Sequence, residues 1–345
     1  MSTDAAALHR DALVVELHSD IPIDVAVRRK KGERAVLLRR HLPRWQAGGV
    51  KASVLTVGGD QQSQRIHDPA DPFRCALLTL QDVRADIRES EGAIVLVTTP
   101  GALRAEVAAG RFAVLLSLEG ASPLLGSLLA LDLFGELGLR AVQLTWNIRN
   151  EVGDGIGEDH RSRLTRFGRA LVGHANRTGI LLDASHLGEG CFWDLAERAT
   201  RPFVCSHSNS AALHHHQRNI TDLQMEAVAR SGGLVGIACY PGFFAERPPT
   251  VEHVLDHVEH ALRVVGAGHV GFGPDYVDYA AEIVQASLEA SGIGYGPMEA
   301  YPAGIARIEE VGSLTEGLVR RGHAPDVIRG VLGEAYLRVL DAVQT

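Results

Sequence analysis

Five apolar, strand-like segments of this chain each end at a residue that can bind a metal ion or move a proton. They are residues 13–18, 112–119, 180–186, 202–207 and 270–275. In a parallel (β/α) barrel every strand delivers its C-terminal end to the same rim, so residues far apart in sequence converge there. The pattern therefore predicts one cup at a barrel rim. Its lining would consist of His18, Asp20, Glu119, His186, His207 and Asp275.

The remainder of the chain fits this α/β architecture, because short apolar segments alternate with longer ones of helical periodicity. Eight barrel strands are expected, at residues 13–18, 51–57, 112–118, 141–145, 180–183, 202–206, 234–238 and 270–273. A ninth apolar segment, residues 93–98, is stopped early by Pro100 and Gly101, which places it in an insertion outside the barrel. A plain barrel needs roughly 250 residues. With 345 residues, the sequence predicts a single domain over residues 1–345, a (β/α)8 TIM barrel with insertions.

Local signals position the outer helices. Thr221 and Gln224 have the spacing of a capping box at the start of residues 222–230. The run of three histidines at residues 214–216 lies on no expected strand, which favours a surface loop over a metal site. Three further histidines at helical spacing, in a polar and acidic segment, are expected on an exposed helix face. They are His253, His257 and His260.

Composition excludes several classes of partner. The formal net charge is −8 and the sequence pI is about 6.0, whereas nucleic acids and anionic membranes select for clustered basic residues. The N-terminus lacks a basic start with an apolar stretch, and no uninterrupted apolar run is long enough for a membrane helix. We therefore expect a soluble, cytoplasmic protein without a membrane or nucleic-acid partner. Four widely spaced cysteines without a CxxC pair are expected to be reduced core residues: Cys75, Cys191, Cys205 and Cys239.

Two candidate ligands lie at the first strand end and a third follows a later strand. His18 and Asp20 are two residues apart, which puts both side chains on one face of an extended segment. An isolated pair of this kind is more often a structural histidine that caps nearby backbone. Glu119 is harder to explain structurally, because a carboxylate buried after so apolar a strand must be paired or bind a cation. Its two oxygens could also bridge two ions.

Two imidazoles follow consecutive strands and so are expected to be neighbours in space. His186 and His207 could each be a structural histidine, but their placement with Glu119 favours a metal centre. His18, Asp20 and Glu119 would hold one ion, while Glu119, His186 and His207 would hold a second. A water that bridges the two ions would be the nucleophile.

Asp275 and Arg218 have open roles. Asp275 could cap a helix after the last strand, or act as general base and acid by taking a proton from that water and returning it to a leaving group. Arg218 could be a solvated loop residue, or it could pair with a substrate carboxylate near the barrel rim.

Over nearly its whole length the chain resembles the membrane dipeptidase (renal dipeptidase) family of zinc peptidases, which are amidohydrolase-like barrels. The motifs are His18-Ser-Asp20, Leu118-Glu119-Gly120, Asp183-Ala-Ser-His186, Ser206-His207-Ser208, Arg218-Asn219, Gly271-Phe-Gly-Pro-Asp275 and Gly333-Glu-Ala-Tyr-Leu-Arg-Val339. Each motif is short, but their order and spacing together are specific. The resemblance implies a binuclear zinc hydrolase, usually a homodimer, that cleaves dipeptides and often tolerates a C-terminal D-residue.

The resemblance also implies roles for individual residues. The two zinc ions would be bound by the two ligand sets proposed above, His18, Asp20 and Glu119 for one and Glu119, His186 and His207 for the other. Asp275 looks like the proton-transferring aspartate of the family, and Arg218 looks like the arginine that holds the terminal carboxylate of the substrate.

One position departs from the family pattern. Many members have Leu-Thr-His-Asn with a histidine thought to assist the substrate carbonyl, where this chain has Leu144-Thr145-Trp146-Asn147. Trp146 donates one N–H but cannot titrate near neutral pH. The metal site is expected to survive this change. Trp146 and Asn147 are therefore expected at the substrate, whose identity the change puts in question.

Three hypotheses follow. The leading one is a zinc dipeptidase in which a zinc-bridging hydroxide attacks the scissile carbonyl. The second keeps the two metals but changes the substrate to another small amide, a lactone or an ester, and is motivated by Trp146. The third is a non-catalytic barrel that serves as a binding protein, which would need none of the six candidate cup residues for packing.

Overall fold

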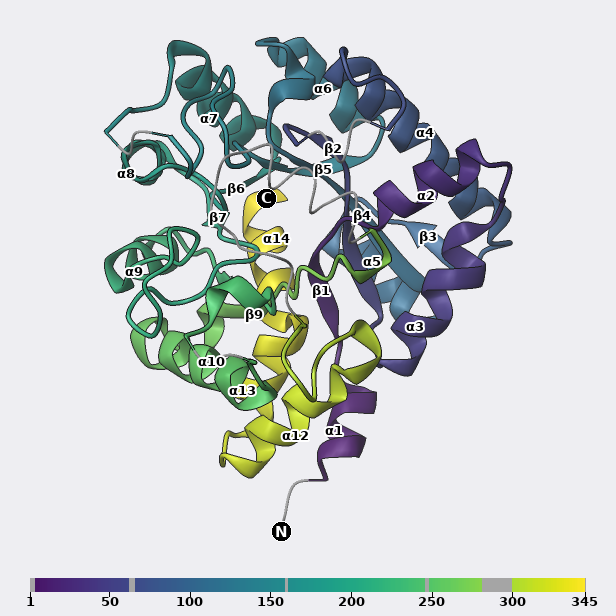
Figure 1. Ribbon diagram of the computed structural model, residues 1–345, viewed down its shortest axis with the longest axis vertical. Coiled ribbons are helices and arrows are strands. Elements are labelled where there is room, and N and C mark those ends of the chain that lie inside the picture. The colour runs from purple at the N-terminus through teal and green to yellow at the C-terminus, as the bar shows by residue number, and fades with distance from the viewer. Residues whose placement is uncertain (1–3, 62–65, 159–160, 246–247, 281–299, 345) are drawn as a thin grey trace.

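The computed structural model describes residues 4–61, 66–158, 161–245, 248–280 and 300–344, and its parallel strands curl into a ring with helices outside (Figure 1). The strands are β1 (Val15–Ser19), β2 (Ala52–Gly59), β3 (Ile94–Leu96), β4 (Phe112–Glu119), β5 (Leu139–Gln143), β6 (Leu181–Asp183), β7 (Phe203–Val204), β8 (Val235–Ile237) and β9 (Val270–Phe272). All eight expected barrel strands are present, most of them shorter than the sequence predicted.

Strand pairing follows the chain around the ring. The main sheet has the order β1-β2-β4-β5-β6-β7, and a parallel bridge between Cys205 and Val235 continues it to the β8-β9 pair. The ring closes between β9 and β1, where Leu17 packs so closely on Gly271 that a Cβ there would lie 2.6 Å from Leu17 Cδ1. This arrangement confirms the predicted α/β barrel.

The ninth apolar segment lies off this path, as predicted. β3 pairs only with the first half of β4, from Phe112 to Val114, whereas β5 pairs with its second half, from Leu116 to Glu119. On its other side β4 pairs with β2. The strand that ends at Glu119 is therefore held by three neighbours.

The helices form the outer layer and the covers of the barrel (Figure 1). Those of six residues or more are α1 (Ala5–Asp11), α2 (Ile21–Lys30), α3 (Leu42–Ala47), α4 (Pro72–Glu89), α5 (Pro100–Ala108), α6 (Leu128–Glu136), α7 (Arg166–Thr178), α8 (Glu189–Arg198), α9 (Asp222–Arg230), α10 (Val251–Val265), α12 (Gly312–Arg320) and α14 (Ala335–Gln344). The capping box of Thr221 and Gln224 is formed, and α9 has the predicted bounds. No helix in the described part of the chain is long and apolar enough to cross a membrane. All four cysteines are buried, and none forms a disulfide with another cysteine of the described residues.

The C-terminal helix α14 closes the N-terminal end of the barrel. Its apolar side chains form one buried cluster with alternate residues of the strands, such as Val15, Val54 and Leu115. The residues just before β7 confirm the placement, because Arg201 donates to the carbonyl of Ala342 near the end of α14. The opposite rim, at the C-terminal strand ends, is the one that carries the candidate cup.

The expectation of an exposed histidine face on α10 was wrong for two of its three residues. His257 and His260 are buried, with exposed fractions of 3% and 7%. His257 Nδ1 accepts a hydrogen bond from the backbone N–H of Ser210, and His260 Nε2 lies 2.7 Å from an oxygen of Asp222 on α9. These partners are distant in sequence, so the polar composition of α10 alone did not reveal them.

We expect Leu337→Ala to lower the free energy of unfolding by about 2–5 kcal/mol, because Leu337 is fully buried between α14 and the barrel wall and its truncation leaves a cavity. Leu223→Ala is the matched control, since Leu223 is 64% exposed on α9 and should change stability by no more than about 0.5 kcal/mol. Urea denaturation of both variants measures the difference. Equal stabilities would contradict the role of α14 as a cover of the barrel.

Candidate metal centre

The strand ends bring the predicted cup residues together. His18 lies near the end of β1 and Glu119 is the last residue of β4, while His186, His207 and Asp275 each follow their strand by three residues. All five are buried or nearly so. His186 and Asp275 have left-handed backbones, with φ of 65° and 59°. Such conformations cost roughly 1–3 kcal/mol each and persist where the surrounding structure holds them, often at functional sites.

Six potential ligand atoms, one of them Glu119 Oε1, are connected by distances of 3.0–3.9 Å. His186 Nε2 lies 3.4 Å from Glu119 Oε1 and 3.0 Å from His207 Nε2, which itself lies 3.8 Å from Glu119 Oε1. On the other side, His18 Nε2 lies 3.6 Å from Glu119 Oε1, 3.9 Å from Asp20 Oδ1 and 3.8 Å from Asp275 Oδ1. The two groups share Glu119, as the sequence predicted.

This spacing fits shared metal ions better than direct hydrogen bonds. Two ligand atoms about 2.1 Å from a tetrahedral zinc lie about 3.4 Å apart, which matches the spacing around Glu119. Distances of 3.6–3.9 Å from His18 Nε2 are too long for hydrogen bonds, and this buried nitrogen has no hydrogen-bond partner within the described residues. A buried polar atom without a partner that faces three carboxylates is what a cation site requires.

The histidines present their Nε2 atoms to the centre of the cup. Asn147 Oδ1 accepts a hydrogen bond from His186 Nδ1 at 2.6 Å, and Ser206 Oγ lies 2.7 Å from His207 Nδ1. These contacts orient each ring so that Nε2 points at Glu119. Burial lowers the pKa of the His18 imidazole to about 3 and holds the pKa values of His186 and His207 well below the ordinary range. The three rings are therefore neutral, the form that binds zinc.

The carboxylates show the opposite shift. Burial, and then the nearby charges of Asp20 and Asp275, hold the pKa of Glu119 well above its ordinary value. Burial raises the pKa of Asp275 to about 6, while the Arg218 guanidinium acts in the opposite direction. Gln61 donates from its amide to Glu119 and, at 3.4 Å, to Asp20 Oδ2. A metal ion would relieve the mutual repulsion of these carboxylates.

Arg218 is buried at the same rim and is not a solvated loop residue. Its exposed fraction is 2%, it donates to the backbone carbonyl of His207, and its guanidinium lies over the Phe243 ring at 5.2 Å. Its Nε has no hydrogen-bond partner within the described ranges. The guanidinium lines one cavity with Glu119 and Asp275, and this placement suits it to bind an anionic group of a ligand.

Trp146 also lines this cavity, with its indole 6.0 Å from the His186 ring. Asn147 lies behind the candidate ligand His186 and contacts it directly, so the predicted substrate-binding pair divides into one residue at the cavity and one that orients the His186 ring. The structure brings all the predicted site residues to one rim.

Sequence reasoning missed several residues at this rim. Gln61, Tyr240 and Phe243 line the cavity, and Asp60 accepts hydrogen bonds from the segment that carries Trp146. A signal existed for Asp60 and Gln61, because a polar pair follows the second predicted strand after Gly58 and Gly59. Because two glycines separate this pair from the apolar segment, the pattern of an apolar strand that ends in a polar residue is interrupted here.

Comparison with known proteins identifies the family. Residues 2–291 match the model of the membrane dipeptidase family (peptidase family M19). The chain belongs to this family. It is 29% identical over 240 residues to the dipeptidase aclJ of Aspergillus oryzae, an alignment that covers 68% of this chain and 52% of that protein.

Solved structures of similar fold support the assignment. An amidohydrolase from Pseudomonas aeruginosa superposes with a TM-score of 0.85 at 24% identity, over 99% of both chains. A metallopeptidase from Rhodobacter sphaeroides, solved with a phosphinate mimic of the dipeptide L-Ala-D-Ala, has a TM-score of 0.81 at 25% identity and covers 96% of this chain and all of that one. The predicted barrel and the predicted class, a metallopeptidase and hydrolase, are confirmed, so the binding-protein hypothesis is not retained.

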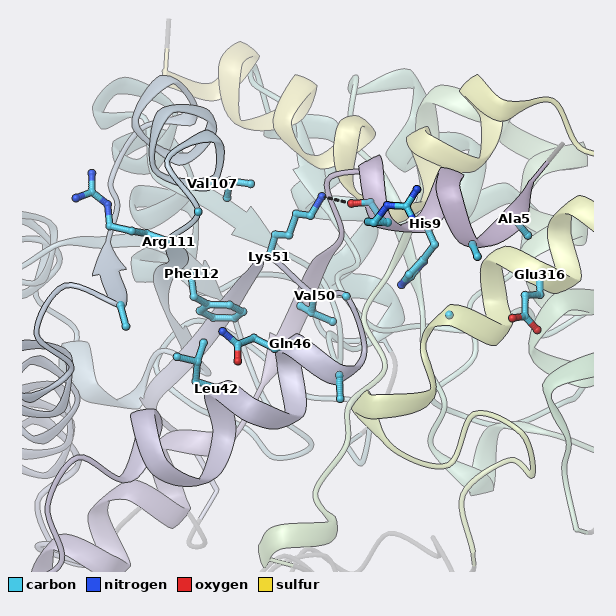
Figure 2. Close-up of a pocket in the computed structure, with 17 residues that line it drawn as sticks. Ala5, His9, Leu42, Gln46, Val50, Lys51, Val107, Arg111, Phe112 and Glu316 are labelled. Atoms are coloured by element: carbon cyan, nitrogen blue, oxygen red, sulfur yellow. Dashed lines mark hydrogen bonds between the residues drawn. The ribbon is translucent and has the colours of Figure 1, made fainter.

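A wider pocket at the other end of the barrel carries no comparable chemistry. It has a volume of about 590 Å³ and lies beside the N-terminal ends of β2 and β4 (Figure 2). Lys51 donates to the carbonyls of Arg10 and Ala12, at 2.7 and 2.6 Å. Both ring nitrogens of His9 are engaged, by Thr315 and by the Gly48 carbonyl. These polar groups are occupied within the protein, whereas the cluster around Glu119 is consistent with the metal site of the M19 family.

We expect the affinity of the metal-free protein for zinc to be lower at pH 5.5 than at pH 7.5. The pKa values of Glu119 and Asp275 are raised, so these carboxylates hold protons at acidic pH and a metal must displace them. The histidines do not compete, because their pKa values are lowered. Chelator competition at the two pH values, with calorimetry in two buffers to count released protons, tests this. An affinity that rises toward acid would contradict it.

Proposed function

We propose that this M19 metallopeptidase is a zinc-dependent dipeptidase that hydrolyses the single peptide bond of a dipeptide, including dipeptides with a C-terminal D-residue. The observation that carries the proposal is the placement of a buried guanidinium, Arg218, beside the buried Glu119 cluster and Asp275 in one cavity. A dipeptide offers the matching pair of groups, a terminal carboxylate and a scissile carbonyl one residue away. The dipeptide mimic bound by the Rhodobacter sphaeroides relative supports the same substrate class.

Two zinc ions per chain are proposed. His18, Asp20 and Glu119 would hold one ion, and Glu119, His186 and His207 the other, with Glu119 shared because its Oε1 lies within 3.4–3.8 Å of all three imidazoles. Bound there, zinc would supply an activated water and polarise the substrate carbonyl. Assembly as a homodimer and a cytoplasmic location remain predictions.

The surrounding side chains would bind the substrate and move its proton. Arg218 would hold the terminal carboxylate with its free guanidinium edge. Asp275 would accept a proton at its carboxylate when water adds to the carbonyl carbon, and would return it to the amine when the C–N bond breaks. Without bound metal, burial raises the pKa of Asp275 to about 6, so the carboxyl group can exist in either protonation state near neutral pH. Trp146 would pack beside the substrate and exclude water.

We expect the zinc-loaded protein to hydrolyse dipeptides and Asp275→Asn to lower kcat by roughly 10²–10⁴-fold, the usual worth of a general acid and base. The variant should retain its zinc, because Asp275 is not among the proposed ligands. A panel of L-L and L-D dipeptides, assayed with and without a chelator, provides the measurement. Asp86→Asn is the control, since Asp86 is also a carboxylate shielded from water but lies on α4 against Leu37 and Arg29. Undiminished kcat in Asp275→Asn would rule out this role.

Arg218→Met should weaken selection for the free C-terminal carboxylate. A hydrogen bond to a charged group is worth about 1.5–3 kcal/mol, so we expect kcat/KM for a dipeptide to fall roughly ten- to a hundredfold. The same variant should hydrolyse the corresponding dipeptide amide about as well as the wild-type protein does, because that substrate has no carboxylate to lose. If kcat/KM falls by the same factor for the dipeptide and for its amide, Arg218 does not bind the terminal carboxylate.

A second substrate class is favoured by one observation, the indole of Trp146 at the cavity wall. Another small amide, a lactone or an ester has no obligatory terminal carboxylate and would use the same metals. Intact dipeptides together with metal-dependent turnover of such compounds would select this alternative.

A further inference from the structure

Asp60 is a buried carboxylate that accepts hydrogen bonds from the loops after two different strands. It is 1% exposed and directly follows β2. Its Oδ1 accepts the backbone N–H of Ser122, after β4, at 2.9 Å. Its Oδ2 accepts the backbone N–H of Trp146 at 2.8 Å and the side-chain amide of Asn150 at 2.9 Å, both after β5.

The approach of Asp60 is possible only beside a glycine. A Cβ on Gly120 would lie within 2.1–2.4 Å of three atoms of the Asp60 carboxyl group, and Gly120 has a left-handed φ of 100°. The backbone N–H of Asp60 also donates to the Glu119 carbonyl at 3.0 Å. The carboxyl group is therefore wedged between the ends of β2, β4 and β5.

The segment that Asp60 holds runs from Trp146 to Asn150. Asn150 extends the anchor, because its Nδ2 also donates to the Leu144 carbonyl at 2.9 Å and its Oδ1 accepts the N–H of Val152 at 2.7 Å. The start and the end of this five-residue segment are thus tied to one carboxylate.

The segment carries the residue that orients a proposed zinc ligand. Asn147 is the residue after Trp146, and its Oδ1 accepts the hydrogen bond from His186 Nδ1 at 2.6 Å. Its backbone carbonyl accepts the N–H of Gly157 at 2.9 Å, and the His186 carbonyl accepts the N–H of Ile156 at 2.8 Å. A shift of the segment would move the side-chain oxygen Oδ1 of Asn147, and the His186 ring that is hydrogen-bonded to it would move as well.

We propose that Asp60 is a positioning residue of the metal centre, which acts by fixing the segment of Trp146 and Asn147 and thereby the orientation of the His186 imidazole. The inference rests on the zinc site of the proposed function but not on its substrate. Asn at this position keeps the shape, yet it replaces one accepting oxygen with a donating NH2 group, so at least one of the three hydrogen bonds is lost.

The test measures zinc affinity without substrate, by chelator competition, in Asp60→Asn, Asn147→Ala and the double variant. Removal of a partner behind a metal ligand typically costs about 10–100-fold in metal affinity, so we expect Asn147→Ala to lie in that range and Asp60→Asn to lose about tenfold. Because Asp60 acts through Asn147, the double variant should lose little more than Asn147→Ala alone. Additive losses would overturn the proposal.

Asp86→Asn separates positioning from general stability, because Asp86 is a buried carboxylate that also accepts a backbone N–H, far from the rim. It should keep zinc affinity within about twofold of wild type even where its melting temperature falls.

If Asp60→Asn does not fold, Asn150→Ala removes one of the three hydrogen bonds to Asp60 and should lower zinc affinity by a smaller factor. Unchanged affinity in the folded Asp60 or Asn150 variant would overturn the proposal. Loss of dipeptide hydrolysis with normal zinc binding would instead count against the proposed substrate.

Discussion

Burial of like charges at the barrel rim is the constraint on which the rest of the site depends. Asp20, Glu119 and Asp275 converge within 4 Å of one imidazole nitrogen, His18 Nε2, in a place that water scarcely reaches. Carboxylates cannot stay ionised together in such surroundings without a cation. The raised pKa of Glu119 and the lowered pKa of His18 share one main cause, burial, which disfavours the charged form of each group. Zinc binding and the charge state of the site are coupled for this reason.

The fold gives this strained cluster a rigid support. β4, which ends at Glu119, is buried along its whole length and pairs with β2, β3 and β5. The carboxylate proposed to bridge the two metals thus lies at the end of a strand held by three others. At the opposite end, α14 packs its apolar face into the barrel, so that stability is concentrated where no chemistry takes place.

Most of the barrel and all of the proposed ligands could be predicted from the sequence, because apolar strands that end in polar residues leave a strong local pattern. The supporting residues could not. Asp60 and Gln61 follow two glycines, and their partners Trp146 and Glu119 are 86 and 58 residues away in the chain, respectively. The same limit explains the error on α10, where the burial of His260 depends on Asp222, a contact that no local pattern encodes.

At the position where this chain departs from the family pattern, a buried carboxylate accepts the backbone N–H. Asp60 binds the N–H of Trp146, which every residue except proline provides, and does not bind the indole. The side chain at this position can therefore differ between relatives while Asn147 and His186 stay in place. Trp146 cannot exchange protons near neutral pH, so proton transfer in this chain would fall to Asp275 alone. Under the proposed function, the metal centre and the contribution of position 146 to substrate binding are thus physically separable: the first would depend on a backbone contact, and the second on the side chain that this backbone carries.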